Sequence, residues 1–176
     1  MTEANPKHTD VILIHNYAFF VETMGNRGVR SLNKYVSVCA LQRVEAETRY
    51  INWMISYECP GMSNLFDRIG GVSGRVNKEE LGLYVPRKEV VAVFKDLNAK
   101  SFHSNIVNMY KRLAKHCSSN ESRELNLIED IWGAITSRLL KIFNQLEDVG
   151  QASYQIQSEL SVDKVQDILD AFHNSM

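Results

Sequence analysis

The sequence predicts an all-α fold, an elongated antiparallel bundle of about seven helices, on three observations. Large apolar residues recur every three or four positions through most of the chain, which is the spacing of a buried helix face. Two of the three prolines, Pro60 and Pro86, fall where helices are expected to end and begin. No run alternates apolar and polar residues for long enough to build a sheet.

Length and composition indicate one folded domain over residues 9–176, with residues 1–8 disordered or an extraneous terminus. Hydrophobic residues make up 44% and charged residues 23% of the 176 positions, which is ordinary for a globular protein. The longest apolar runs, such as 17–21 and 90–94, are far shorter than the roughly 20 residues of a membrane span. The first ten residues lack the pattern of a secretory signal. The three widely spaced cysteines fit reduced thiols in the cytosol.

The first helix is expected to follow a cap at Thr9 or Asp10 and to end near Met24, where Gly25 and Gly28 break the pattern. The second runs from about residue 29 to 58 and has no internal proline or glycine. Its apolar residues cover more than one face, so we expect neighbouring helices to pack on two sides of it. These residues are Leu32, Val36, Cys39 and Ala46 on one side, and Tyr35, Val38, Leu41, Val44, Ile51 and Ile55 around the other.

Four shorter elements are expected in the middle of the chain. A helix at about 62–72 is followed by a glycine-rich break at 70–74. Residues 77–80 have the spacing of a capping box, which opens at most a short helical turn. Pro86 is placed as the first residue of a helix ending near residue 97, and another helix spans about 100–117.

The strongest helical pattern lies between residues 121 and 149, after a second capping-box spacing at 118–121 and before Gly150. Its apolar residues form one stripe that carries no carboxylate pair, histidine or cysteine, which indicates a packing role. A last helix is expected after a cap at Ser161. The stripe residues are Leu125, Ile128, Trp132, Ile135, Leu139, Ile142 or Phe143, and Leu146, and the last helix presents Val162, Val165, Ile168, Leu169 and Phe172.

No catalytic, cofactor or metal site is predicted, and we do not expect an enzyme. The five histidines show no metal-ligand spacing, and His116 beside Cys117 lacks a second pair. The glycines at 70–74 lack the Gly-Lys-Ser/Thr of a phosphate loop. Glu45 and Glu47 lie two positions apart on a helix and so face different directions.

One helical face carries Lys111, Arg112, Lys115 and His116. It is either a solvated face or a contact for an acidic partner or anionic lipid. Net charge is also uneven: residues 1–120 have 16 Lys and Arg against 11 Asp and Glu, and residues 121–176 have 4 against 10. That asymmetry reflects solvated faces or a module docking between unlike partners. It is too small to favour nucleic acid.

Several segments, taken in order, resemble the C-terminal domain of the exocyst complex component one family. The resemblance covers about residues 11–172 through an Asn-Tyr-x-x-Phe opening, a helix with spaced tyrosines, a basic helix, a tryptophan helix and a terminal helix. The segments are HNYAFF from His15, RVEAETRYINWMISY from Arg43, NKEELGLYVPRKEVVAVF from Asn77, MYKRLAKH from Met109, LIEDIWGAITSRLLKIF from Leu127 and VDKVQDILDAF from Val162.

The resemblance implies a non-catalytic, rod-like module of the exocyst, the complex that holds secretory vesicles at the plasma membrane before fusion. Its partners would be other exocyst subunits and, weakly, an anionic membrane surface, with no nucleic acid and no small-molecule substrate. It would be cytoplasmic and peripheral at sites of secretion. If the resemblance holds, the family's lipid- and GTPase-binding amino-terminal region would be missing from this sequence, so we do not expect lipid or GTPase binding to transfer to it. The alternative is an unrelated all-α adaptor or small-GTPase regulator that binds a partner helix.

Overall fold

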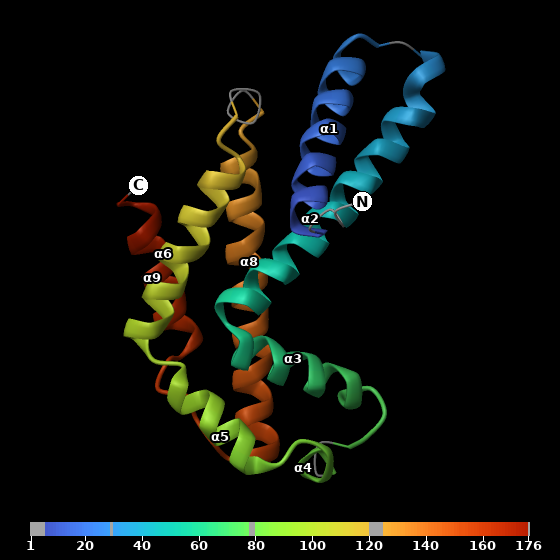
Figure 1. Ribbon diagram of the computed structural model, residues 1–176. Helices are drawn as coiled ribbons and strands as arrows, with labels where there is room; N and C mark the ends of the chain where they lie inside the picture. Colours follow the sequence, from blue (N-terminus) through green and yellow to red (C-terminus); the bar gives the residue numbers. More distant parts are fainter. Residues whose placement is uncertain (1–5, 29, 78–79, 120–124, 176) are drawn as a thin grey trace, which may run out of the picture. The chain divides into compact units, whose positions relative to one another are not determined.

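Every regular element is helical in the residues that the computed structural model describes, which are 6–28, 30–77, 80–119 and 125–175 (Figure 1). The all-α prediction is therefore confirmed, with eight α-helices in these ranges where about seven were predicted. They are α1 (Pro6–Asn26), α2 (Asn33–Glu58), α3 (Pro60–Ser73), α4 (Leu81–Tyr84), α5 (Arg87–Asp96), α6 (Ala99–His116), α8 (Leu127–Val149) and α9 (Val162–His173), with a 3-10 turn at Arg30–Leu32 and a π turn at Gly150–Tyr154.

The chain divides into two compact units, to both of which α2, α6 and α8 contribute residues. The first unit comprises residues 1–54 and 110–134, and the second comprises residues 55–109 and 135–176. The prediction of one elongated domain over residues 9–176 stays a prediction.

In the first unit, α2 is tied to each of the other helices by polar side chains. Arg49 donates to Asp10 Oδ1 of α1 at 2.8 Å, and Arg43 donates to Asp130 Oδ2 of α8 at 2.9 Å. Tyr50 bonds to His116 of α6. The apolar core beneath these contacts consists of buried residues from all four helices, namely Ile14, Ala18, Ala46, Tyr50, Ile51, Met54, Leu113, Cys117, Leu127, Ile131 and Trp132.

In the second unit, short helices pack on the rest of α8. Phe102 of α6 meets Phe143 of α8 edge to face, with ring centroids 5.1 Å apart. Arg68 of α3 bonds to Glu89 of α5 and donates to the Tyr84 carbonyl at 3.0 Å. The buried Tyr154 hydroxyl donates to the Val85 carbonyl at 2.7 Å, which joins the π turn to the end of α4. These contacts hold α3, α4, α5 and the π turn together.

Several predicted helix ends are wrong by a few residues. The first helix begins at Pro6, so residues 6–8 are helical and Asp10 lies inside α1, where it binds Arg49 instead of capping. Helix α3 begins at Pro60, two residues before the predicted start, and continues through Gly70 and Gly71 to Ser73, within the predicted break at 70–74. Pro86 caps α5 with extended backbone and is not its first helical residue. Local pattern sets helix ends only within a few residues, because tertiary contacts extend or shorten the last turn.

The described start of α8 differs from prediction, whereas its end agrees with it. Its described part begins at Leu127, and the predicted start at 121 and capping box at 118–121 fall partly outside the described residues, as does the box at 77–80. The predicted end is confirmed, since α8 ends at Val149, immediately before Gly150. The chain then continues from Gly150 as a π turn that closes at Gln155 in the left-handed region, with φ of 52°. Gly150 also lies against Phe94, whose ring leaves no room for a β-carbon. The predicted Ser161 cap of α9 is confirmed, since its hydroxyl accepts from the Lys164 N–H.

Candidate functional site

Helix α6 carries the basic face that the sequence singled out. The helix is fixed at its start by Asn98 and Ser101, whose side chains each accept a hydrogen bond from the other's backbone N–H, at 3.0 and 3.3 Å. This reciprocal capping satisfies two backbone donors that a helix start leaves unpaired. Near the end of α6, in the first unit, Leu113 and the following Cys117 are buried. The other residues from 111 to 116 are exposed or half-buried.

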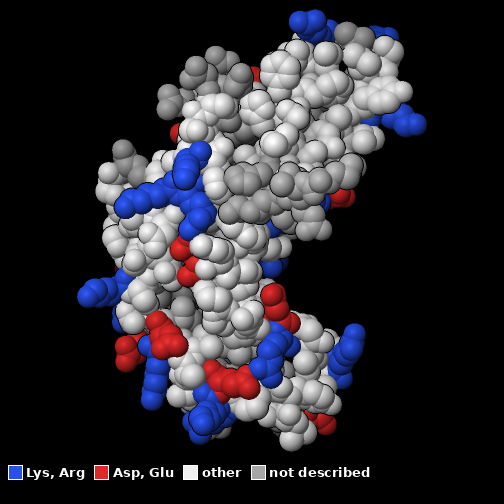
Figure 2. Space-filling model, in the orientation of Figure 1, with Lys and Arg blue, Asp and Glu red and all other residues white. Residues whose placement is uncertain are grey.

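The four predicted residues divide into two pairs along the helix. Lys111 and Lys115 are exposed and lie one turn apart, whereas Arg112 and His116 are half-buried. Figure 2 shows Lys and Arg side chains gathered over the carboxyl-terminal part of α6. The structure therefore brings two lysines to the surface together and turns the histidine inward.

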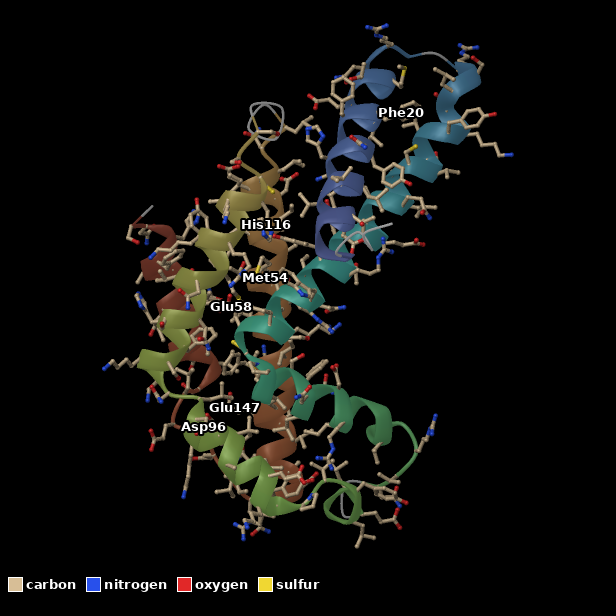
Figure 3. The ribbon with its side chains drawn as sticks, in the orientation of Figure 1. Phe20, Met54, Glu58, Asp96, His116 and Glu147 are labelled. Carbon is tan, nitrogen blue, oxygen red and sulfur yellow. The ribbon has the colours of Figure 1, made fainter. Side chains whose placement is uncertain are left out.

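His116, which Figure 3 labels on α6, contacts two aromatic residues of α2, all within the first unit. The Tyr50 hydroxyl and the His116 Nδ1 are 2.8 Å apart and form a hydrogen bond. The Tyr50 ring meets the imidazole edge to face at a centroid distance of 5.9 Å, and the Trp53 ring lies 6.2 Å from it. His116 thus helps join α6 to α2, a role that local sequence did not suggest.

The Tyr50 hydroxyl is held in its neutral form. The side chain is fully buried, and this burial raises its pKa well above the ordinary value, with Cys117 adding to the rise and Arg112 opposing it. A protonated phenol hydrogen-bonds to an imidazole without placing a charge in the core. The pair serves as a polar connection between two helices.

Two of the cysteines are poor nucleophiles for the same reason. Burial raises the pKa of the Cys117 thiol, and of the Cys59 thiol, from 9.0 to about 11. An amide N–H of Asn105 donates to the Cys59 sulfur at 3.3 Å and partly counters the rise. Because the thiolate is the reactive form, both thiols are unreactive at neutral pH.

Two cavities lie each within one unit, and their linings contain few titratable groups. A cavity of about 270 Å³ in the first unit holds Arg43 and Glu22, and Arg43 is already bound by Glu47 and Asp130. These partners raise the pKa of Arg43 although burial alone would lower it. A cavity of about 280 Å³ in the second unit is lined by Val76, Asn77, Leu81, Gln145, Asp148, Val149, Ala152 and Ser153.

The described residues contain no group of three or more His, Cys, Asp or Glu side chains placed to hold a metal ion. None of the helices in the described ranges is long and apolar enough to cross a lipid bilayer.

Four apolar residues of α2 that were predicted to pack against neighbouring helices are exposed. Tyr35, Val38, Leu41 and Val44 of α2 are 60%, 50%, 66% and 58% exposed. The prediction that neighbours pack on two sides of α2 is therefore wrong for this half of the helix within the described residues. The signal in the sequence was that α2 has more apolar positions than one neighbouring helix can cover, which is also the pattern of a helix with an exposed apolar surface.

Comparison with known proteins identifies the same family that the ordered segments of the sequence resemble. The family model described as the C-terminal region of exocyst complex component Sec3 matches residues 2–156. The mouse (Mus musculus) protein exocyst complex component 1 is 21% identical over 178 residues, which cover 96% of this chain and 19% of that protein. No solved structure matches the chain.

An all-helical chain that this family model matches over most of its length is a member of that family. The chain belongs to the family of the C-terminal region of exocyst complex component Sec3. It spans about a fifth of the length of the curated relative that it matches.

Proposed function

We propose that this chain is a non-catalytic helical module of the exocyst that acts through protein–protein contacts in vesicle tethering. The observation that carries the proposal is the family match over residues 2–156, together with a described structure made only of helices and their connections. Tethering requires stiff elements and several weak contacts whose avidity supplies strength. Its partners are other exocyst subunits, and it works in the cytoplasm, peripherally at plasma-membrane sites of secretion.

The chemistry of the described side chains supports a binding role over catalysis. The cysteines Cys59 and Cys117 are protonated at neutral pH, and His116 is engaged with Tyr50. Arg43, which lines a cavity, is satisfied by two carboxylates. A catalytic site needs a nucleophile or proton carrier with a tuned pKa facing a cavity, and these groups are committed to packing.

We further propose that Lys111 and Lys115, with Arg112 and His116 behind them, contact an acidic surface of another subunit. Each basic residue near an anionic membrane contributes only about 1 kcal/mol, so two exposed lysines bind lipid weakly. An acidic protein surface can add fixed, complementary geometry to the same charges. This favours a protein partner over lipid as the main contact of this face.

The test is recovery of partners by the tagged chain from its native cells, with identification by mass spectrometry. Other exocyst subunits are expected among the recovered proteins, and recovery of a small GTPase alone would favour the regulator alternative. Recovery of no exocyst subunit would overturn the proposal.

A matched pair of variants separates the basic face from general charge. Lys111→Glu with Lys115→Glu is expected to lower subunit recovery, whereas Lys88→Glu with Lys95→Glu, two exposed lysines of α5, leaves it unchanged. Equal recovery with both variants would show that the α6 face is only solvated.

A further inference from the structure

Four large apolar side chains follow one another at three-residue steps along the exposed surface of α2. We name these side chains the α2 apolar row; they are Tyr35, Val38, Leu41 and Val44. Each of them is at least half exposed. Single exposed apolar residues are normal, but a contiguous set on one element marks an interaction surface. The row lies wholly within the first unit.

The spacing of the row suits another helix. Its members are three positions apart, so they form an oblique ridge that winds about halfway round α2 from Tyr35 to Val44, with Val38 and Leu41 at its middle. Ridges of this kind pack into the grooves of a facing helix at a shallow crossing angle. A helix that presents its own apolar stripe along this ridge would therefore cover its middle members, Val38 and Leu41, and meet Tyr35 and Val44 at its edges.

Charge around the row identifies the chemistry of that helix. From residue 23 to residue 44 the chain has four basic residues and no acidic residue. Arg43 is already paired with Glu47 and Asp130. Arg27, Arg30 and Lys34 are exposed, and no ion pair joins them to any other residue that the structure describes. Figure 2 shows Lys and Arg side chains around the end where α1 and α2 meet.

The polar residues beside the row favour a protein over a lipid surface. Gln42 and Glu45 are both exposed and share a hydrogen bond of 3.0 Å, and they follow Val38 and Leu41 by four positions. They therefore lie next to the row on the same side of the helix. Immersing a carboxylate in hydrocarbon is costly, whereas a partner protein can leave it hydrated or bond to it.

We propose that the α2 apolar row binds an amphipathic helix of a partner protein, whose apolar stripe covers the row and whose acidic residues face Arg27, Arg30 and Lys34. The inference rests on the proposed function, because an assembly module needs such a surface, and it deepens it by naming the surface and the partner's chemistry. The occupant is a helix that combines apolar and acidic faces.

The test uses the 176-residue chain and a labelled synthetic amphipathic peptide with leucines on one face and glutamates beside them. An otherwise identical peptide carries lysines in place of the glutamates. Fluorescence anisotropy is expected to show that the glutamate peptide binds about tenfold tighter than the lysine peptide. The difference should shrink as salt is raised, because the pairing charges are exposed.

Variants of the chain locate the binding. Leu41→Asp is expected to weaken glutamate-peptide binding about tenfold, since it removes an apolar contact and adds a like charge. Leu83→Asp is the matched control, because Leu83 is 82% exposed on α4 outside the row, and it should bind as the parent chain does. Arg30→Glu with Lys34→Glu should reverse the preference between the two peptides.

Three results would overturn the inference. The first is absent or equal binding of the two peptides, or no effect of Leu41→Asp. The second is sedimentation with phosphatidylserine-containing vesicles that Leu41→Asp abolishes, which assigns the row to a membrane. The third is a dimer, detected by light scattering, that Leu41→Asp converts to a monomer, which assigns the row to a second copy of the chain.

The inference and the proposed function fail separately. If exocyst subunits are recovered but the peptide results are negative, the row is not the docking surface and the proposed function stands. If the peptides bind as expected but no exocyst subunit is recovered from cells, the surface stands and the proposed function fails.

Discussion

The Tyr50 hydroxyl bonds to the His116 Nδ1 at 2.8 Å, joining two positions 66 residues apart in the chain. The pair connects the middle of α2 to the last turn of α6, inside the first unit. Because the ring of Tyr50 is fully buried, its hydroxyl has few alternatives to this partner.

Tyr50→Phe is expected to lower the free energy of unfolding by about 1 kcal/mol, the net value of a typical hydrogen bond. Thermal unfolding should show a drop in Tm of about 2–4 °C for a chain of this size. Tyr35→Phe, at an exposed position, is the control and should leave Tm unchanged. A Tm for Tyr50→Phe equal to that of the parent chain would mean that the bond contributes nothing to stability.

Trp132→Ala is expected to destabilise the fold by about 3–5 kcal/mol, as for other buried large aromatics. Trp132 is only 4% exposed, and its ring meets Tyr110 edge to face at 5.2 Å. Urea unfolding followed by circular dichroism measures the change. The neighbours Leu127 and Ile128 test the helix face: Leu127→Ala should cost more than Ile128→Ala, because Leu127 is buried and Ile128 is half-exposed. The reverse order would show that α8 is rotated.

Gly150→Ala is expected to destabilise by about 1–3 kcal/mol through overpacking. A β-carbon at this position would lie 2.7 and 2.9 Å from two atoms of the Phe94 ring and 3.1 Å from the Ile156 carbonyl oxygen. Gly70→Ala is the matched control, since a β-carbon there meets nothing within 4 Å inside α3. Gly70→Ala should stabilise by about 0.5–1 kcal/mol through helix propensity. Similar denaturation midpoints for the two variants would contradict the contact with Phe94.

Charge reversal at Lys111 and Lys115 is expected to change the free energy of unfolding by less than about 0.5 kcal/mol, because both side chains are exposed. Arg112→Glu should cost about 1 kcal/mol more, since Arg112 is half-buried and a carboxylate there is partly desolvated. Equilibrium denaturation distinguishes the two. A large loss for the lysine pair would show that these side chains stabilise the fold.

Alkaline pH is expected to destabilise the folded chain through its buried thiols. The pKa values of Cys59 and Cys117 rise from 9.0 to about 11 on folding, so the unfolded chain loses these protons first. The contribution of the two thiols to the free energy of unfolding is therefore complete below pH 9 and is lost between pH 9 and about 11. The loss is at most about 1.4 kcal/mol per thiol for each pH unit.

Urea denaturation at pH 8 and at pH 10.5 measures this loss. The variant Cys59→Ala with Cys117→Ala serves as the control and should lose less stability between the two pH values than the parent chain. Equal losses would assign the alkaline sensitivity to other groups.

The sequence predicted the helices well because their apolar spacing is a local property. It placed Trp132, Ile135, Leu139 and Leu146 on the buried face of α8, and all four are buried. It missed Ile131, because a helix with more than one neighbour buries the edges of its stripe as well as its centre. Periodicity finds a face but does not show how many neighbours cover it.

The same limit explains the error on α2. Local spacing identified Val38 and Leu41 as apolar helix positions, but whether another helix covers them depends on the rest of the chain, and both are exposed. For the basic face of α6, one part could likewise be predicted from the sequence and another could not. Exposure of Lys111 and Lys115 follows from helix geometry, whereas the bond of His116 depends on Tyr50, which lies far away in sequence.

The contact between Gly150 and Phe94 has a consequence for how this family can diverge. The two positions share one small volume, so neither can be replaced at will while the other stays as it is. Relatives that carry a side chain at the position equivalent to 150 should carry a smaller residue opposite it. An alignment of many relatives would reveal the two positions as a pair that changes in concert.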